Sequence, residues 1–441
     1  MHISDLNGKS VCILGFGREG KAMVTALNTY APDARVTIAD KNPKTDTQGL
    51  PLTAYSVQLG ESWLENLDTF DVIIKSPGIP PSSQLKTQSS KLTSSTQIFL
   101  DTIESSGALT IGVTGSKGKS TTASLIHHLI ETLPPIPYAR TLLVGNIGDP
   151  AIAHLADAKK DTIFVMEMSS YQLMDLRTAP HIAVITSFFP EHLDYHASTV
   201  RSTGLTPLEA YRNAKANITR LQKSGDIVFY ADTEGVRPMV AGTHAKRIPV
   251  TAKQAPLPLS DTKLIGDHNL SNLALAGAVA SHLGVDSAGI GTAMRSFTPL
   301  PHRLQSLGIR DGIEWIDDAI STTPDSAIAA IEALGDRVKV IILGGQDRGL
   351  DFTELGTVID TSSIDTVILF GENSTRIGKT ITQKITIPVH SMHEVITTTI
   401  HALRNHQTST PIALLSPASP SYDSYSNFEE KGEDFRAKIG F

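Results

Sequence analysis

Residues 113–121 read VTGSKGKST, which places two glycines and a lysine between an apolar run and a helical pattern. The apolar run, 109–113, predicts a buried strand, and the pattern after Thr121 predicts a helix that ends near Pro134. In this order of elements, a glycine loop directs backbone N–H groups and the positive end of the helix dipole at a phosphate. The segment therefore predicts a phosphate-binding loop. The alternative is a glycine-rich turn without a ligand.

Five residues of this segment could bind phosphates and a metal ion. Gly115 and Gly118 let the backbone approach the phosphates, and Lys119 supplies a positive charge to the outer ones. Ser120 or Thr121 supplies a hydroxyl oxygen, which is a ligand that suits Mg²⁺.

A second glycine loop, residues 15–20, reads GFGREG and follows the apolar run 10–14. Asp40 closes the next predicted strand, 36–39, twenty residues after Gly20. This combination is typical of dinucleotide-binding folds, in which the loop approaches a diphosphate and the acid binds a ribose hydroxyl. It predicts a site for a nucleotide diphosphate. The alternative is a turn that only packs a helix against a sheet.

Polar residues follow other predicted strands and helices. Glu167 follows the apolar run 162–166, where a carboxylate in a protein with a phosphate loop usually anchors Mg²⁺; the alternative is a helix cap. For His192, after a later strand, a structural and a functional role both remain open. Lys215 lies on a predicted helix, 208–221, and periodicity alone would make it a solvated surface lysine.

Strands and helices alternate along the whole chain, which predicts an α/β fold. A junction around residues 299–303 precedes a third group of apolar strands at 338–343, 366–370 and 412–415. The length of 441 residues fits two to four domains. We expect three, with boundaries at residues 1–97, 98–300 and 301–441.

Composition excludes several classes of partner. The net charge of −7 gives the whole chain no attraction to nucleic acid or to an anionic membrane. Cys12 is the single cysteine and lies in an apolar strand, so it is expected to be a core residue. The N-terminal residues lack an apolar signal segment, and no apolar run reaches membrane-spanning length. A cytoplasmic protein without nucleic-acid or membrane partners is expected.

Several short motifs, in this order and spacing, together resemble the Mur ligases, enzymes of peptidoglycan synthesis. The motifs are 114–121 (TGSKGKST), 167–173 (EMSSYQL), 211–215 (YRNAK), 268–269 (HN), 300–303 (LPHR), 416–418 (SPA) and 427–429 (NFE). The resemblance implies a Rossmann-like N-terminal domain that binds UDP, a central P-loop ATPase-like domain and a Rossmann-like C-terminal domain that binds the amino acid.

The expected activity is ATP-dependent amide-bond formation between glutamate and UDP-N-acetylmuramoyl-L-alanine through an acyl phosphate. The resemblance implies small-molecule substrates and a monomer. By the same resemblance, the ATP site contains Gly115, Gly118, Lys119, Ser120, Thr121, Asn272, Arg303 and Asp318. Lys119, His192 and Lys215 would be catalytic. Two Mg²⁺ sites would use Ser120, Glu167, His192 and Lys215, the last as a carbamate.

The resemblance also implies two substrate sites. The UDP substrate would contact Gly15, Phe16, Gly17, Asp40, Ser76, Gly78, Asn146 and Gln172. The incoming glutamate would contact Thr322, Arg348, Ser421 and Phe428.

The sequence departs from the family pattern at a few positions, namely Arg18, Glu19, Ser187, Glu191, Ile320 and Arg348. Arg348 stands where a lysine is expected at a glutamate carboxylate, and Ile320 replaces another lysine. These changes are more like a smaller subfamily that adds L-glutamate. The family at large favours D-glutamate, which is our first choice, with L-glutamate as the alternative.

The sequence fits other classes of function less well. The loop 15–20 with Asp40 would suit an NAD-dependent oxidoreductase, but that class leaves Lys119 and Glu167 without a role. A non-catalytic binding module would not need Lys119, His192 and Lys215 together. Within the ligases, another amino acid or a folate-type acceptor is conceivable.

Overall fold

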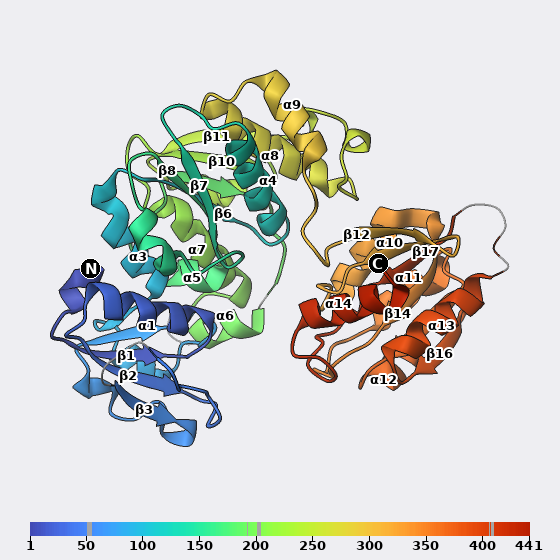
Figure 1. Ribbon diagram of the computed structural model, residues 1–441, viewed down its shortest axis with the longest axis horizontal. Helices are drawn as coiled ribbons and strands as arrows, with labels where there is room; N and C mark the ends of the chain where they lie inside the picture. The colour runs from blue at the N-terminus through green and yellow to red at the C-terminus, as the bar shows by residue number, and fades with distance from the viewer. Residues whose placement is uncertain (51–54, 192, 201–203, 405, 407–409) are drawn as a thin grey trace. The chain divides into compact units, whose positions relative to one another are not determined.

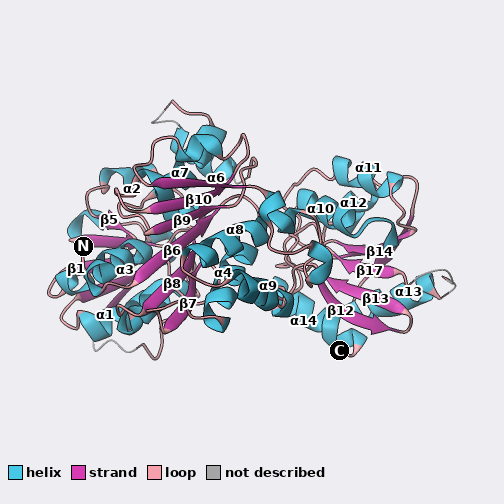
Figure 2. Cartoon of the chain, turned by 90° about the horizontal axis from the view of Figure 1, so that it is seen from above, coloured by secondary structure: helices cyan, strands magenta, loops and turns pink. Residues whose placement is uncertain are grey.

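The computed structural model describes residues 1–441 apart from 51–54, 192, 201–203, 405 and 407–409. The chain forms two compact units: Met1–Pro258 with Leu270–Phe297, and Leu259–Asn269 with Thr298–Phe441. Three sheets with flanking helices make up these units, and the expected α/β fold is confirmed (Figures 1 and 2). The domain boundaries expected at residues 97 and 300 stay a prediction.

The first sheet is parallel throughout and has the strand order β3-β2-β1-β4-β5 (blue in Figure 1). Its strands are β1 (Ser10–Leu14), β2 (Arg35–Asp40), β3 (Tyr55–Leu59), β4 (Val72–Lys75) and β5 (Leu92–Thr93). Its helices are α1 (Arg18–Tyr30), α2 (Ser83–Thr87) and α3 (Ser95–Ile103). Strand order reverses at β1, so the ends of β1 and β4 form the point at which α/β sheets bind ligands.

The second sheet is also parallel, with the order β11-β10-β9-β6-β8-β7. Its strands are β6 (Leu109–Thr114), β7 (Arg140–Gly145), β8 (Thr162–Glu167), β9 (Ile182–Ile185), β10 (Ile227–Ala231) and β11 (Lys246–Val250). Its helices are α4 (Lys119–Thr132), α5 (Ser170–Met174), α6 (Leu193–Val200), α7 (Pro207–Arg220), α8 (His268–His282) and α9 (Ser287–Ser296). Helices α4 and α7 both contact the central strand β6.

The third sheet has the order β12-β13-β17-β14-β15-β16. Its strands are β12 (Gln305–Arg310), β13 (Ile313–Asp317), β14 (Val338–Leu343), β15 (Thr366–Phe370), β16 (Ile385–Val389) and β17 (Ile412–Leu415). Its helices are α10 (Pro324–Leu334), α11 (Thr353–Thr361), α12 (Ser374–Gly378), α13 (Met392–Leu403) and α14 (Phe428–Ile439). The three strands predicted from the sequence here, β14, β15 and β17, pair parallel, whereas β12 pairs antiparallel with β13. Asp311 and Gly312 connect the two strands with φ of 54° and 75°, the backbone that a tight hairpin turn requires.

Central strands are apolar on both faces because helices cover both sides of each parallel sheet. Ile111 and Val113 in β6 and Ile13 in β1 are at most 1% exposed. Cys12 is fully buried as expected, and burial raises the pKa of its thiol to about 12. Within the described parts of the chain, none of the helices combines the length and apolar character needed to cross a bilayer.

Candidate active site

The predicted phosphate loop lies between the end of β6 at Thr114 and the first residue of α4, Lys119. Gly118 has φ of 83°, and a Cβ atom there would lie 2.4 Å from Asn272 Oδ1. Only glycine fits this position because the backbone is left-handed and the space is already filled. The N–H groups at the start of α4 therefore form an anion site of the kind that binds phosphate.

Hydrogen bonds from the neighbouring β9 loop fix the shape of the phosphate loop. The Ser187 hydroxyl accepts from Lys117 N at 2.8 Å and donates to Lys117 O at 2.9 Å. Lys117 Nζ forms an ion pair with Glu191 Oε1 at 2.8 Å. Ser187 and Glu191 are two of the departures from the family pattern, and both hold the loop here. No local sequence pattern predicts this role.

Helix α4 begins at Lys119, before the helical pattern predicted after Thr121, so Lys119, Ser120 and Thr121 occupy its first turn. Lys119 Nζ donates to Ser116 O at 2.7 Å, so its cation lies over the loop. Asn272, on α8, accepts a hydrogen bond from Thr122 Oγ1 at 3.1 Å through its Oδ1. The structure thus brings Asn272 to the phosphate loop, although it lies about 150 residues further along the chain.

Glu167 ends β8 and is 1% exposed. Its Oε1 accepts from Asn146 Nδ2 at 3.1 Å, whereas Oε2 is buried and has no hydrogen-bond partner among the described residues. A buried carboxylate oxygen without a donor fits a hard cation such as Mg²⁺. The described residues contain no group of three or more His, Cys, Asp or Glu side chains that could hold a metal. A Mg²⁺ site completed by a hydroxyl and phosphate oxygens does not need one.

Lys215 lies on α7 and is 1% exposed, so the surface position that periodicity suggested is wrong. Its Nζ donates to Gly115 O at 2.6 Å and lies 4.8 Å from the centre of the Tyr211 ring. Burial, helped by the nearby charge of Lys119, lowers the pKa of Lys215 well below its usual range. His192, its expected partner, lies outside the described residues.

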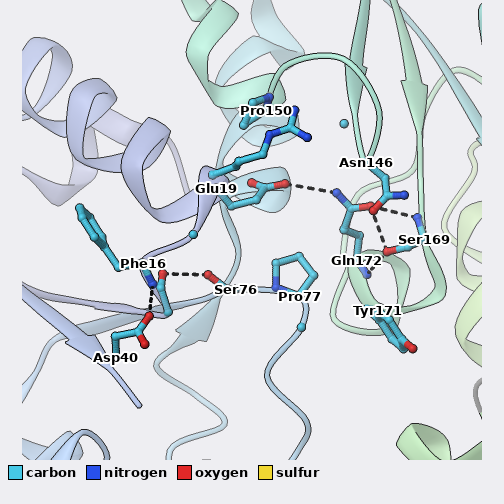
Figure 3. Close-up of a pocket in the computed structure, with 15 residues that line it drawn as sticks. Phe16, Glu19, Asp40, Ser76, Pro77, Asn146, Pro150, Ser169, Tyr171 and Gln172 are labelled. Atoms are coloured by element: carbon cyan, nitrogen blue, oxygen red, sulfur yellow. Dashed lines mark hydrogen bonds between the residues drawn. The ribbon is translucent and has the colours of Figure 1, made fainter. Parts of the chain in front are cut away.

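A cavity of about 400 Å³ lies in the first unit, between the loop after β1 and the ends of β7 and β8 (Figure 3). All eight residues expected to bind the UDP substrate line it: Gly15, Phe16, Gly17, Asp40, Ser76, Gly78, Asn146 and Gln172. Asp40 accepts hydrogen bonds from Phe16 N at 2.7 Å and Asn42 N at 2.8 Å. Ser76 Oγ donates to Gly15 O at 2.9 Å. These contacts shape the loop for close approach of a diphosphate.

The cavity has a second wall that the sequence did not predict. Glu19 Oε1 accepts from Gln172 Nε2 at 3.3 Å, and Gln172 Oε1 in turn accepts from Ser169 N at 2.9 Å (Figure 3). Burial raises the pKa of Glu19, whose other oxygen accepts from the Ser95 hydroxyl. Tyr171 also lines this wall. Only folding reveals this hydrogen-bonded chain, because its members come from separate elements.

The second unit contains the remaining predicted residues. Asp318, just after β13, is 5% exposed, and it accepts from Leu304 N at 3.1 Å and Ser416 Oγ at 2.8 Å. Burial raises its pKa to about 7. Arg303 Nε is buried and has no hydrogen-bond partner within the described chain.

Three of the four residues expected to bind glutamate follow adjacent strands of the third sheet, β13, β17 and β14. Thr322 lies after β13, Arg348 after β14 and Ser421 after β17, whereas Phe428 begins α14. The Ser421 hydroxyl is buried without a hydrogen-bond partner in the part of the chain described.

The fold and the site define a nucleotide-binding α/β protein with a phosphate loop beside a buried strand-end carboxylate. The Mur ligase middle domain matches residues 113–255, and the Mur ligase glutamate ligase domain matches residues 302–413. The chain belongs to the Mur ligase family and is a ligase, as the motifs predicted.

Relatives match over the full length of the chain. A UDP-N-acetylmuramoyl-L-alanine--L-glutamate ligase of Salinispora tropica is 34% identical, with 100% of this chain and 99% of the relative covered. The enzyme of the same name from Xanthomonas euvesicatoria is 31% identical, with 100% of this chain and 97% of the relative covered. The fold is similar to that of the MurF ligase of Thermotoga maritima in complex with ADP, with a TM-score of 0.58 and 16% sequence identity. The similarity covers 99% of this chain and 96% of the MurF chain.

Proposed function

We propose that the protein uses ATP to join L-glutamate to the alanyl carboxylate of UDP-N-acetylmuramoyl-L-alanine, a step of peptidoglycan synthesis. The full-length similarity to relatives named for this reaction carries the proposal. These names favour L-glutamate over the D enantiomer that was our first choice from the sequence. Arg348 and Ile320, which depart from the family pattern, point the same way. ATP and a UDP-sugar are cytoplasmic metabolites, so a cytoplasmic location is part of the proposal.

The phosphate loop would bind ATP. Backbone N–H groups at the start of α4 would hold the phosphates, and Lys119 would stabilise the charge that develops on the transferring phosphoryl group. Glu167 Oε2 and the Ser120 hydroxyl would hold Mg²⁺, which neutralises phosphate charge when bound. Asn272, Arg303 and Asp318 would contact the rest of the nucleotide, as the family resemblance implies.

The proposed reaction has two steps. An alanyl carboxylate oxygen attacks the γ-phosphorus of ATP, ADP leaves, and an acyl phosphate forms. The amine of glutamate, after losing a proton, then attacks the carbonyl carbon. A C–N bond forms, the C–O bond to the phosphate breaks, and inorganic phosphate leaves. Both steps depend on holding charged reactants in line rather than on a covalent enzyme intermediate.

The acceptor would occupy the cavity of about 400 Å³ in the first unit. Its diphosphate would lie against the loop 15–20, because the N–H groups at the start of α1 face that side of the cavity. Its peptide end would extend towards Asn146 and Gln172, at the ends of β7 and β8. Asn146 also donates to Glu167, so this wall of the cavity adjoins the proposed metal ligand.

Release of inorganic phosphate from ATP tests the proposal. We expect phosphate release that requires Mg²⁺, UDP-N-acetylmuramoyl-L-alanine and L-glutamate together. Substitution of Lys119 by alanine should lower kcat by about 10²–10³, the usual loss for one preorganised charge-stabilising group. Equal release with another amino acid from a panel of acidic, neutral and basic ones would contradict the proposed specificity.

A further inference from the structure

Two loops meet at the end of the third sheet where Arg348 lies. One follows β14 and the other follows β17, and these strands are parallel neighbours. Gly344 N donates to Pro417 O at 2.8 Å, and Gln346 N donates to Pro420 O at 2.8 Å. The buried Lys431 Nζ donates to Gly344 O at 2.7 Å. The backbone of the first loop is therefore fixed against the second on both sides of Gly345.

This arrangement fixes the guanidinium group of Arg348 at two points. Its Nε donates to Gln346 Oε1 at 3.0 Å, and its Cζ lies 5.5 Å from the centre of the Tyr422 ring. One face of the guanidinium group lies against the aromatic ring, and its Nε already donates a hydrogen bond. The edge that carries the two Nη atoms can therefore donate to a planar acceptor. A carboxylate matches that edge with two parallel hydrogen bonds.

The charge of Arg348 has no acidic partner in the described residues, although an acid is its direct neighbour. Asp347 instead forms an ion pair with Arg376 Nη1. Arg376 Nη2 donates to Leu350 O at 2.8 Å, which holds the second arginine in place. Arg376 therefore keeps Asp347 away from Arg348.

We infer that Gln346, Tyr422 and Arg376 are positioning residues that keep Arg348 as a preformed receptor for one carboxylate of the incoming amino acid. The inference rests on the proposed function and explains how the site distinguishes an acidic amino acid from its amide. The side-chain amide of such an amino acid would direct N–H donors at the N–H donors of the guanidinium group, and the pairing of opposite charges would be lost. Ser421, next to Tyr422, offers a buried hydroxyl without a described partner as a further contact for the same substrate.

The Arg376→Leu substitution tests the role of charge. It should free Asp347 to pair with Arg348 and raise the KM for glutamate about fivefold, with kcat and the KM for ATP within twofold of wild type. Adding Asp347→Asn to the same chain should restore the KM, because the competing carboxylate is then gone. Arg337→Leu is the matched control, since it breaks a comparably exposed ion pair, with Glu314 at 2.6 Å, elsewhere in the same unit.

The Tyr422→Glu substitution tests the same receptor from its other side. It removes the aromatic face and places a carboxylate beside Arg348, so the KM for glutamate should rise about tenfold. Tyr422→Phe keeps the ring and should behave like wild type. Ser424→Glu is the control. Ser424 is exposed and lies two residues away on the same loop, so this substitution adds the same charge outside the contact between Arg348 and Tyr422.

The outcomes separate this inference from the proposed function. A wild-type enzyme without glutamate-dependent phosphate release would contradict the proposed function itself. If the wild type is active with glutamate, an unchanged KM in Arg376→Leu and Tyr422→Glu would overturn the inference. The inference would also be overturned if Asp347→Asn did not restore the KM for glutamate in the Arg376→Leu enzyme. A decrease in kcat without a change in KM in either variant would overturn it as well.

Discussion

Lys215 has the two properties that a lysine needs before it can react with carbon dioxide. Its amine is buried beside the phosphate loop, and burial together with the charge of Lys119 lowers its pKa, which favours the neutral amine that can react with carbon dioxide. A carbamate there would turn a cation into a carboxylate able to bind a metal. The helical pattern of residues 208–221 could not show this, because periodicity describes one helix and not the loop against which the helix packs.

Replacement of Lys215 tests that role. Lys215→Ala should abolish turnover, and short carboxylates such as acetate should restore part of it by taking the place of the carbamate. Lys215→Arg should remain inactive because a guanidinium cannot form a carbamate, although it keeps the positive charge. Steady-state phosphate release measures both variants, and full activity of Lys215→Arg would rule the carbamate out.

Asp318 should make stability depend on pH. Burial raises its pKa from 3.8 to about 7, so between these values the folded protein holds a proton that the unfolded chain has released. Its contribution to the free energy of unfolding is therefore complete below pH 4 and is lost as the pH rises through 7. Asp318→Asn removes this dependence. The Tm of the variant minus that of wild type should increase from pH 5 to pH 8, as measured by calorimetry, and a constant difference would be inconsistent with the raised pKa.

At the scale of elements, the junction between β6 and α4 carries the chemistry. The sequence predicted this junction because glycine positions, apolar runs and a helix start are all local signals. It did not predict that Ser187 and Glu191 hold the loop from β9, because hydrogen bonds between distant segments leave no local pattern. The hairpin of β12 and β13 was missed for another reason. Its sequence signal, Asp311 followed by Gly312, is only two residues long and lies between strands that lack a long apolar run.

Gly118→Ala tests the geometry of the junction. The new Cβ would lie 2.4 Å from Asn272 Oδ1 at a φ of 83°, so the loop or α8 must shift. We expect the KM for ATP to rise at least tenfold while the protein remains folded by circular dichroism. Gly242→Ala is the control, because nothing lies within 4 Å of the added carbon there. An unchanged KM for ATP in Gly118→Ala would separate this loop from nucleotide binding.

At the scale of the whole molecule, the sequence predicted the α/β fold. The eight residues named as contacts of the UDP substrate are among the fifteen that line the cavity, and their contact with that substrate stays a prediction. They were predicted because their motifs are short and local. Glu19 and Tyr171, which also line the cavity, were not among them, since a cavity wall depends on which strand ends become neighbours. Family membership leaves the NAD-dependent oxidoreductase without support.

Ligand-dependent stability tests the cavity. UDP-N-acetylmuramoyl-L-alanine should raise the Tm because it binds the folded protein. At a concentration of a hundred times its Kd, it should add about 2.7 kcal/mol to the free energy of unfolding. NAD should leave the Tm unchanged. Gly15→Ala should weaken the effect, because its Cβ would lie 2.8 Å from Ser76 Oγ. Stabilisation by NAD alone would return the oxidoreductase to consideration.

The most direct measurement of the proposed reaction is mass spectrometry of its products. The enzyme is given ATP, Mg²⁺ and UDP-N-acetylmuramoyl-L-alanine labelled with ¹⁸O in the alanyl carboxylate, with L- or D-glutamate in separate reactions. We predict a glutamyl product with L-glutamate and one ¹⁸O atom in the inorganic phosphate, because the acyl phosphate transfers a carboxylate oxygen to phosphate. Product with D-glutamate only, or unlabelled phosphate beside the amide product, would contradict the account.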